Sequence, residues 1–526
     1  MKKIEIFDST LRDGAQSEGI SFSVQDKLNI VKALDNFGVS YIEAGNPGSN
    51  PKDLAFFEQL QKICLKHAKL CAFGSTHRKN MPVEQDTNIQ SLLAANTPVV
   101  AIFGKAWNLH VTKILKISVA DNLALVRDTV SYLKKQGKEV IFDAEHFFDG
   151  YKEMKEYALQ VLQAAADGGA DCLCLCDTNG GALPNEIFFA VSEVSQHFPD
   201  KKIAIHCHDD IGCAVASSML AVEAGASQVQ GTFIGFGERC GNADLSVIIP
   251  NLRLKYQMDC DGDLPLLSKT AVKIAEISNI PLRSNKPYVG RSAFAHKGGM
   301  HIDGVQKISR SFEHVDPEQV GNERKFLMSE VSGRTTVLAK IKDYAPDLTK
   351  DSPQTALIVE KLKELEHFGY QFEAADASFE ILVKKLLGRF TPHFSLVLYK
   401  TTGEFPAPDG KMQSSAMIQI KVDGKAETTA SVGNGPVNAL DLALRKALMV
   451  FYPELKKIHL TDYKVRVFDT EQATGAKVRV LIESTDGTEV WTTVGVSTDI
   501  IEASWNALVD SLEYKLTKLD EEKKKL

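Results

Sequence analysis

Short apolar runs alternate with amphipathic stretches along the first half of the chain. Eight of these runs are typical of β-strands, and the stretches between them, such as Val24–Phe37, repeat apolar residues at the i, i+3 and i+4 spacing of a helix. Eight strand–helix units in about 250 residues favour a closed parallel (β/α)8 barrel, the TIM-barrel fold, over an open doubly wound sheet. The expected strands are Lys3–Ser9, Tyr41–Gly45, Leu70–Ser75, Val99–Gly104, Glu139–Ala144, Cys172–Cys176, Ile203–His208 and Gln228–Ile234.

The pattern changes twice beyond the barrel. It becomes mainly helical, with a glycine-rich, histidine-bearing segment at Ala293–Gly304. After Thr391, apolar and polar residues alternate with period two, as at Ile418–Val422, which indicates half-buried strands. These strands form two β-β-β-α units in tandem, ending in helices at Val437–Val450 and Ile500–Leu516, so we expect an α+β domain with internal pseudo-symmetry.

This pattern predicts three domains and a tail. The barrel occupies residues 1–265, a helical linker or subdomain residues 266–390, and the α+β domain residues 391–516. The charged tail at 517–526 contains Asp520–Lys525, which we interpret as a solvated charge run and nothing more.

Composition and charge narrow the class of protein. Hydrophobic residues make up 44% and charged residues 25% of the 526 residues, as in ordinary globular proteins. The formal net charge of −7, without a basic block, argues against nucleic acid or an anionic membrane as a partner. No apolar run reaches the roughly 18 residues of a membrane span. The nine cysteines contain no CxxC pair and lie mostly in apolar runs, so we expect free thiols in a reducing cytoplasm.

Charged and polar residues gather where the predicted barrel strands end. Functional residues of a (β/α)8 barrel lie at this end, and burial alone would favour apolar residues there. The cluster therefore predicts a site. Its members include Arg12, Asp13, Glu43, Glu145, Thr178, His206, His208 and Asn242.

The pair His206 and His208 is the sharpest local signal. Residues i and i+2 of a strand point the same way, so both imidazoles can face one point at the barrel mouth. With Asp13 from the first strand they form a set of two imidazoles and one carboxylate that leaves positions open for a substrate. The alternative is two histidines hydrogen-bonded in a polar strand end. We favour a metal site because Asp13 is predicted at the same rim.

Two neighbouring features have competing interpretations. Arg12 beside Asp13 could form a surface ion pair that caps the first barrel helix, but its position favours binding a carboxylate or stabilising an oxyanion. Cys172, Cys174 and Cys176 look like a metal motif. We expect alternate cysteines to face opposite sides of the strand, and we interpret all three as core residues.

Three separated motifs carry a family resemblance. The segment FDSTLRDGAQ at residues 7–16 resembles the amino-terminal signature of the 2-isopropylmalate, homocitrate and citramalate synthases. HCHDDIG at 206–212 and GERCGNA at 237–243 resemble that family's second signature, and the tandem repeat resembles its allosteric domain. The longer citramalate synthases are most similar, through FDAEHFFDG at 142–150, AHKGGMH at 295–301 and SEVSGR at 329–334.

The resemblance implies a metal-dependent condensation of acetyl-CoA with a 2-oxo acid. Asn242 would join Asp13, His206 and His208 on a divalent cation, and Mn, Zn, Mg and Co are not distinguished. The remaining roles follow the family pattern: Thr178 holds the oxo-acid carboxylate, Arg12 stabilises the developing negative oxygen, and His301 paired with Glu145 is the base. Glu43 binds substrate, or caps a helix or orients a neighbour. The alternatives are a turn-capping His301 and a structural Glu145.

The resemblance also bears on substrate, regulation and assembly. Pyruvate is the preferred oxo acid, which gives citramalate on a route to isoleucine; 2-oxoisovalerate, as used by 2-isopropylmalate synthase, is second and homocitrate synthesis third. The non-enzyme alternative is a catalytically silent sensor of branched-chain amino acids. We expect isoleucine to bind the α+β domain, and His301 to reach the partner's barrel in a domain-exchanged homodimer. The alternative for the α+β domain is a dimerisation module that binds no ligand.

Overall fold

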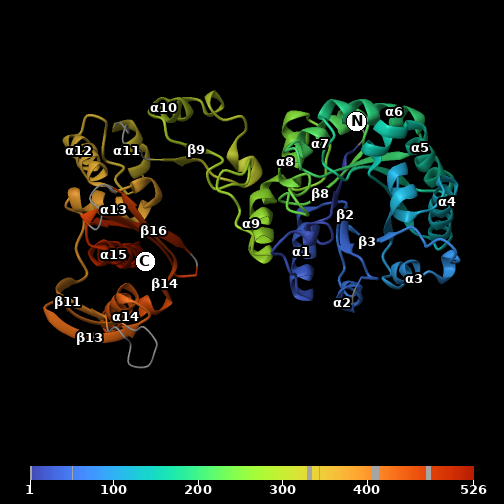
Figure 1. The fold of residues 1–526 in the computed structure, drawn as a ribbon. Coiled ribbons are helices and arrows are strands. Elements are labelled where there is room, and N and C mark those ends of the chain that lie inside the picture. The colour runs from blue at the N-terminus through green and yellow to red at the C-terminus, as the bar shows by residue number, and fades with distance from the viewer. Residues whose placement is uncertain are drawn as a thin grey trace. The chain divides into compact units, whose positions relative to one another are not determined.

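The computed structural model describes residues 3–49, 51–327, 334–342, 344–403, 414–468, 475–487 and 489–525. The chain forms two compact units, drawn in Figure 1. The first consists of Met1–Phe294 and Glu313–Arg324, and the second of Ala295–Phe312 and Lys325–Leu526. Most of the family-like motif at 329–334 lies outside the described residues.

The first unit is the predicted (β/α)8 barrel. Its eight strands are parallel and close in sequence order, with β1 paired to both β2 and β8. The strands are β1 (Glu5–Asp8), β2 (Tyr41–Gly45), β3 (Lys69–Ser75), β4 (Val99–Lys105), β5 (Glu139–Glu145), β6 (Cys172–Asp177), β7 (Lys202–Cys207) and β8 (Gln228–Gly231). The helices are α1 (Val24–Phe37), α2 (Pro51–Leu60), α3 (Thr87–Ala94), α4 (Val119–Lys135), α5 (Phe147–Asp167), α6 (Pro184–His197), α7 (Ala214–Glu223), α8 (Leu245–Pro250) and α9 (Leu267–Ser278).

Two boundaries show how local chemistry sets the elements. Helix α1 begins at a capping box between Ser23 and Asp26 and ends at Gly38, whose φ of 95° is readily adopted only by glycine. Strand β8 ends at Gly231, earlier than predicted, because the chain turns there: the Gly235 N–H donates to the Thr232 carbonyl. The apolar residues after Gly231 therefore pack in the core beyond the strand rather than extending it.

The interior of the barrel has its own small core. It contains Phe7, Tyr41, Cys71, Val99, Ala101, Ile141, Cys172, Cys174, Cys176 and Ala204. The expectation that alternate cysteines face opposite sides of their strand is wrong, because side-chain direction repeats every two residues. Cys172, Cys174 and Cys176 all point into this interior core, and the prediction that they are core residues is confirmed.

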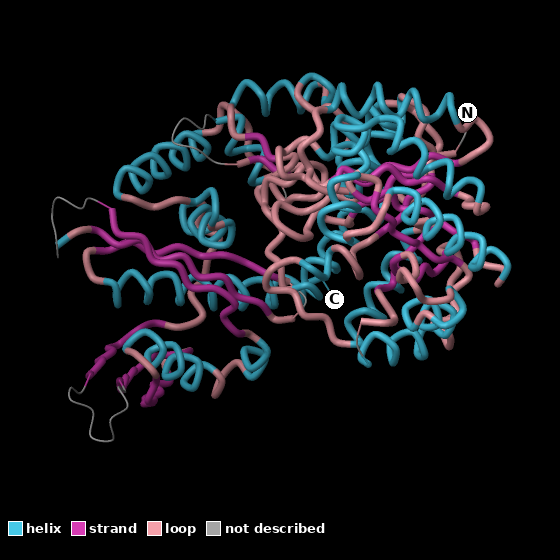
Figure 2. Tube along the Cα trace, turned by 45° about the vertical axis from the view of Figure 1, so that its right-hand side comes forward, coloured by secondary structure: helices cyan, strands magenta, loops and turns pink. Residues whose placement is uncertain are grey.

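In its described residues, the second unit carries helices, a short two-stranded sheet and two three-stranded sheets. A short parallel pair joins β9 (Ala295–His296) to β10 (Lys325–Phe326), and the helices that follow in the chain are α10 (Gly299–Lys307), α11 (Arg334–Ile341), α12 (Pro353–Phe368) and α13 (Asp376–Leu386). The two three-stranded antiparallel sheets are β11 (Ser395–Gly403), β12 (Ser414–Val422) and β13 (Lys425–Gly433), then β14 (His459–Phe468), β15 (Lys477–Thr485) and β16 (Val490–Ser497). Helices α14 (Pro436–Leu448) and α15 (Ile500–Lys525) pack on them (Figure 2). The tandem β-β-β-α repeat is thereby confirmed.

The Asp520–Lys525 run is helical as well as charged, and Glu522, Lys523 and Lys524 within it are exposed, as expected of a solvated run. Helix α15 continues to Lys525, nine residues beyond the Leu516 that the pattern predicted. Its last turns are fixed by side chains elsewhere in the unit: Asp520 pairs with His393 at 3.1 Å and Glu521 with Lys384 at 2.5 Å.

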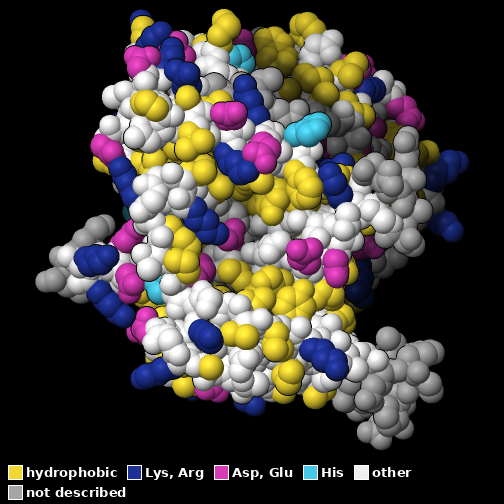
Figure 3. All heavy atoms as spheres, turned by 90° about the vertical axis from the view of Figure 1, so that its left-hand side faces the viewer, with side chains coloured by type: hydrophobic (Ala, Val, Ile, Leu, Met, Phe, Trp, Pro, Cys, Tyr) yellow, Lys and Arg dark blue, Asp and Glu magenta, His cyan; other side chains and the backbone are white. Residues whose placement is uncertain are grey.

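The surface of the second unit mixes charge with apolar residues. Figure 3 shows acidic and basic side chains interspersed on the face it presents, with hydrophobic side chains gathered between them. Strands β11 and β14, each at the edge of its sheet, expose Leu396, Val397, Leu398, Val465 and Val467. Among the described residues, the helices lack the length and apolarity that crossing a bilayer requires.

Candidate active site

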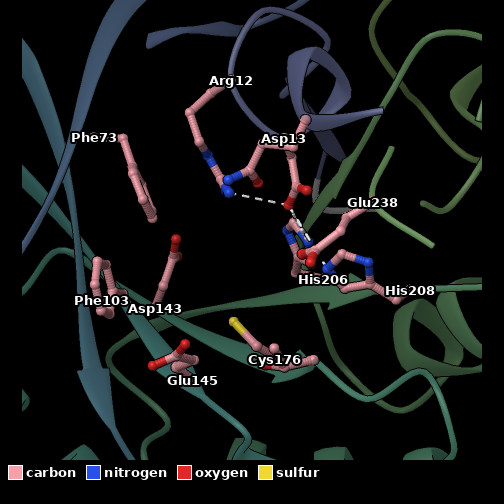
Figure 4. A pocket seen from close by; sticks show the side chains of 12 residues that line it. Arg12, Asp13, Phe73, Phe103, Asp143, Glu145, Cys176, His206, His208 and Glu238 are labelled. Atoms are coloured by element: carbon pink, nitrogen blue, oxygen red, sulfur yellow. Dashed lines mark hydrogen bonds and ion pairs between the residues drawn. The ribbon is translucent and has the colours of Figure 1, made fainter. Parts of the chain in front are cut away.

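The carboxyl ends of the barrel strands enclose a cavity of about 250 Å³. Figure 4 shows its side chains converging from several strands on one space. It is lined by Arg12, Asp13, Gln16, Phe73, Phe103, Asp143, Glu145, Cys176, Thr178, His206, His208 and Glu238. Six of the nine residues predicted from the sequence therefore line one cavity. Glu43 and Asn242 adjoin it through direct contacts with its lining residues, and His301 belongs to the second unit.

Asp13, His206 and His208 form a compact, buried cluster. The Oδ2 atom of Asp13 lies 3.2 Å from Nε2 of His206 and 3.7 Å from Nε2 of His208. One ligand atom from each residue falls within 4.8 Å of the others, which suits three ligands of one cation. Burial, and then the neighbouring His206, lower the pKa of His208 to about 4, so this imidazole is uncharged at neutral pH, as a metal ligand must be.

Asn242 is the strongest sign that the cluster is built for a ligand. It is 2% exposed, and its backbone pairs with His208 in an isolated antiparallel bridge. Neither its Oδ1 nor its Nδ2 has a hydrogen-bond partner among the described residues. A Cβ atom at Gly237 would lie 2.2 Å from Nδ2, so a glycine is needed there to admit the amide. A buried amide without partners costs free energy unless something else binds it.

The orientation of His206 depends on Gln230, a residue that sequence reasoning missed. Nδ1 of His206 lies 3.0 Å from Oε1 of Gln230, so the Nδ1 hydrogen is donated there and Nε2 is left for a cation. The Gln230 amide in turn donates to Oδ1 of Asp143 at 3.3 Å. Two buried glutamines, Gln228 and Gln230, on a predicted core strand were the available signal.

Arg12 is held firmly at the rim. Its Nε donates to Glu43 at 2.8 Å, its Nη1 donates to Asp13 at 3.0 Å, and its guanidinium stacks 3.9 Å above the Phe73 ring. Burial disfavours the charged form of Arg12, but the negative charges of Glu43 and Asp13 outweigh this effect and raise the pKa of Arg12. Burial likewise opposes ionisation of Asp13, yet the Arg12 charge and the two histidines hold the pKa of this carboxyl below its usual range. Glu43 thus contacts Arg12 from within β2.

Glu145 and Thr178 line the cavity from the ends of β5 and β6. Glu145 forms an ion pair with Lys105 of the neighbouring strand, a residue that sequence reasoning also missed. His146 then adopts a left-handed conformation with φ of 56°, and its N–H donates to Oγ1 of Thr178 at 2.9 Å. Because the Thr178 oxygen accepts that bond, its own hydroxyl hydrogen remains available to a ligand.

Asp143 is a buried carboxyl at the floor of the cavity. Its Oδ1 accepts a hydrogen bond from Gln230 at 3.3 Å. Burial, and then the nearby Glu43, raise its pKa to about 6. Its oxygen lies within 4.8 Å of both Sγ atoms of Cys174 and Cys176, so these three residues form a second cluster of potential metal ligands.

A second cavity of about 410 Å³ adjoins the first. The two share Arg12, Gln16 and Phe73. Its further lining comes from the turn after β1 and from the segment after β2, and includes a buried ion pair between Lys27 and Asp53. A molecule that occupied both cavities would pass Arg12.

His301 is carried by α10 of the second unit. Its ring stacks on Phe312, with centroids 4.3 Å apart. The side chain is exposed, and among the described residues it makes neither a hydrogen bond nor an ion pair.

Known protein families match the chain along almost its whole length. Residues 3–280 match the HMGL-like family, residues 288–369 the homocitrate synthase post-HMGL domain-like family, and residues 373–516 the LeuA allosteric (dimerisation) domain. The chain is 52% identical to the (R)-citramalate synthase of Aquifex aeolicus and 49% identical to that of Geobacter sulfurreducens, with 99% of each chain covered in both comparisons. It is 30% identical to the 2-isopropylmalate synthase of Methanocaldococcus jannaschii, over 98% of this chain and 95% of that one.

Proposed function

Since the chain belongs to the (R)-citramalate synthase family, within the HMGL-like proteins, we propose that it condenses acetyl-CoA with pyruvate to give (R)-citramalate and CoA. The observation that carries the proposal is 52% identity to a protein of that name over 99% of both chains. The 30% identity to a 2-isopropylmalate synthase supports 2-oxoisovalerate as the second candidate acceptor. The match of residues 288–369 to a homocitrate synthase domain keeps 2-oxoglutarate as the third. One water is consumed when the thioester is hydrolysed, which makes the reaction irreversible.

Asp13, His206 and His208 would hold the divalent cation, with Asn242 as a further ligand. The fit rests on the compact cluster, on the uncharged His208 and on the unpartnered Asn242 amide. Histidine nitrogen with carboxylate and amide oxygen suits Mn, Zn, Mg or Co alike. When bound, the cation would supply Lewis acidity that polarises the ketone of the oxo acid.

Thr178 and Arg12 orient the oxo acid from two sides. The free hydroxyl hydrogen of Thr178 donates to its carboxylate, since the Thr178 oxygen already accepts from His146. Arg12 uses two of its donors on Glu43 and Asp13, and the others stabilise the negative oxygen that develops at the ketone. Glu43 and Phe73 contribute to substrate binding by keeping the guanidinium in place.

The proton chemistry falls to His301 and Glu145. His301 removes a proton from the acetyl methyl group, and the carbanion equivalent attacks the ketone carbon. Glu145, at the cavity wall, accepts a hydrogen bond from the His301 imidazole and fixes the tautomer that acts as the base. We assign the adjoining cavity to the CoA portion of acetyl-CoA, because it is large and meets the first cavity at Arg12.

A thiol-release assay tests the reaction. Acetyl-CoA is supplied with pyruvate, 2-oxoisovalerate or 2-oxoglutarate, each with and without a chelator, and free CoA is titrated. We expect the highest kcat/KM with pyruvate and no release after chelation. Preference for 2-oxoisovalerate would overturn the acceptor assignment. Each methylene of the acceptor changes selectivity by only about 1–3 kcal/mol, so a few substitutions in the pocket can switch the preferred acid. No release with any acid would favour the amino-acid sensor.

The α+β domain is proposed to bind isoleucine and to inhibit the barrel. Its support is the match of residues 373–516 to the LeuA allosteric domain. In the strand-to-helix turns before α14 and α15, two backbone N–H groups already have side-chain partners. The Asn434 N–H already donates to Asn438, and the Ile501 N–H to Asp499. An effector carboxylate would use donors other than these two N–H groups.

Calorimetry on the intact chain tests this regulation. We expect isoleucine to bind more tightly than leucine or valine and to lower turnover, because an inhibitor must prefer one of two states of the enzyme. Alanine is the matched control, since it has the same amino and carboxylate groups without the branched side chain. Failure of all three branched amino acids to bind at about 1 mM would leave a dimerisation module without a ligand.

We further propose a homodimer with domain exchange, located in the cytoplasm. The exposed apolar residues of edge strands β11 and β14 support a partner surface, since such edges are normally covered. All nine cysteines are free thiols, which suits a reducing compartment. The functional division at residues 1–265, 266–390, 391–516 and 517–526 is retained as part of the same proposal.

A further inference from the structure

The interior of the barrel holds a second set of potential metal ligands beneath the first. Cys174 and Cys176 of β6 point the same way, and their Sγ atoms lie 4.0 Å apart. One oxygen of Asp143, on the neighbouring strand β5, completes a trio whose ligand atoms all lie within 4.8 Å of one another. All three side chains are buried, and none of them belongs to the Asp13, His206 and His208 cluster.

The spacing of the two sulfurs fits one thiophilic cation. Two thiolates bound at about 2.3 Å in a tetrahedral arrangement lie about 3.8 Å apart, close to the separation observed here. The same separation is far too long for a disulfide, whose sulfurs lie about 2.05 Å apart. Sulfur ligands select soft ions such as Zn²⁺ and Cd²⁺ over Mg²⁺ or Mn²⁺, whereas the histidine cluster accepts the harder ions as well.

The trio is accessible from the cavity, and hydrogen bonds through Gln230 connect it to the histidine cluster. Asp143 and Cys176 both line the cavity at the barrel mouth, so a cation that enters there meets them. Asp143 accepts a hydrogen bond from Gln230, which in turn holds Nδ1 of His206. A cation that takes the Asp143 carboxylate therefore removes one anchor of the glutamine that orients His206.

We propose that Asp143, Cys174 and Cys176 form a second site, specific for a thiophilic divalent cation such as Zn²⁺ or Cd²⁺, whose occupation inhibits the enzyme. Binding replaces the two thiol hydrogens by bonds to the cation and releases two protons, so the affinity rises with pH. The site is independent of the proposed condensation, because its binding can be measured without substrate.

Cadmium titration of the intact protein tests the site directly. Cd²⁺ is added to enzyme in excess Mg²⁺, and the thiolate-to-cadmium absorption in the ultraviolet is followed. We expect a saturable band at one equivalent with the intensity of two thiolates. Cys174→Ser should weaken this binding at least about tenfold, and His206→Ala should leave the band unchanged. Inhibition of turnover by Cd²⁺ should follow the band and be relieved in Cys174→Ser.

Cys172→Ser is the matched control. Cys172 lies on the same face of the same strand and in the same interior core, but outside the trio. This variant should retain the full band and the full inhibition. If Cys174→Ser fails to fold, the ¹¹³Cd resonance of the unaltered protein shows whether sulfur binds the ion. Cadmium bound to sulfur resonates far from cadmium bound to nitrogen or oxygen. The absence of a saturable two-thiolate signal, or its equal loss in Cys172→Ser, would overturn the proposal.

Discussion

Replacing His206 with alanine is expected to lower turnover by at least about 1,000-fold, or about 4 kcal/mol of transition-state stabilisation. The cause is the loss of one of three ligand side chains that meet within 4.8 Å. Asp13→Ala should have the same effect, because its Oδ2 faces both imidazoles and Nη1 of Arg12. Turnover is measured by thiol release, and bound cation by elemental analysis of dialysed protein.

Both variants should remain folded. His206 is buried, and its removal leaves Oε1 of Gln230 without its partner, which costs about 1–3 kcal/mol. That is a fraction of the stability that the large apolar core of the first unit provides. Circular dichroism and thermal unfolding check this point.

His77→Ala is the matched control for the loss of a buried imidazole. His77 lies just beyond β3, hydrogen-bonds Thr129 and is absent from the lining of the cavity. Its loss removes the same atoms from the barrel unit, yet turnover and cation content should stay within about twofold. Near-normal turnover and cation content in His206→Ala or Asp13→Ala would refute the ligand assignment.

The sequence predicted the barrel and the meeting of Asp13, His206 and His208 because both follow from short-range rules. Strand periodicity identified eight strands, and the i, i+2 rule placed His206 and His208 on one side. The connectivity of a (β/α)8 barrel then brings the end of β1 beside the other strand ends, and Asp13 with it. The error over Cys172, Cys174 and Cys176 came from misapplying that same rule.

The remaining features depend on contacts between distant segments. Gln230 matters because β8 passes beside β7, and Lys105 because β4 lies beside β5. Asn242 turns inward because Gly237 leaves room for its amide. The adjoining cavity at Lys27 is formed by loops after two strands, and loop shape is poorly encoded by periodicity. Helix α15 continues beyond its apolar pattern, and its end carries ion pairs with residues distant in the sequence.

His301 raises a different question, since the sequence places it beyond the barrel. In the second unit it is exposed and stacks on Phe312, without a polar partner among the described residues. A general base acts within hydrogen-bond reach of its substrate, in a site from which water is excluded. If His301 is the proposed base, it meets a barrel mouth, either that of its own chain or that of a partner chain.

Mixing two inactive variants separates these possibilities. His301→Ala should lower turnover by about 100-fold to 10,000-fold, and His206→Ala by at least as much. If His301 acts on the partner's barrel, a hybrid dimer pairs the intact barrel of the His301→Ala chain with the intact His301 of the other chain. Random exchange makes half of the dimers hybrid, each with one working site of two, so about one quarter of full activity returns. Thiol release is followed after subunit exchange, which tagged chains confirm by co-purification.

The control mixture combines His206→Ala with Asp13→Ala. Both changes disable the barrel that carries them, so every hybrid has two dead barrels and no activity should return, whichever chain supplies His301. Activity in this mixture would mean that exchange alone, or reversion, restores turnover. Confirmed exchange between the His301→Ala and His206→Ala chains without any return of activity would rule out a base supplied by the partner. His301 would then act on its own barrel, or not at all, and each barrel with its own second unit would be a complete enzyme.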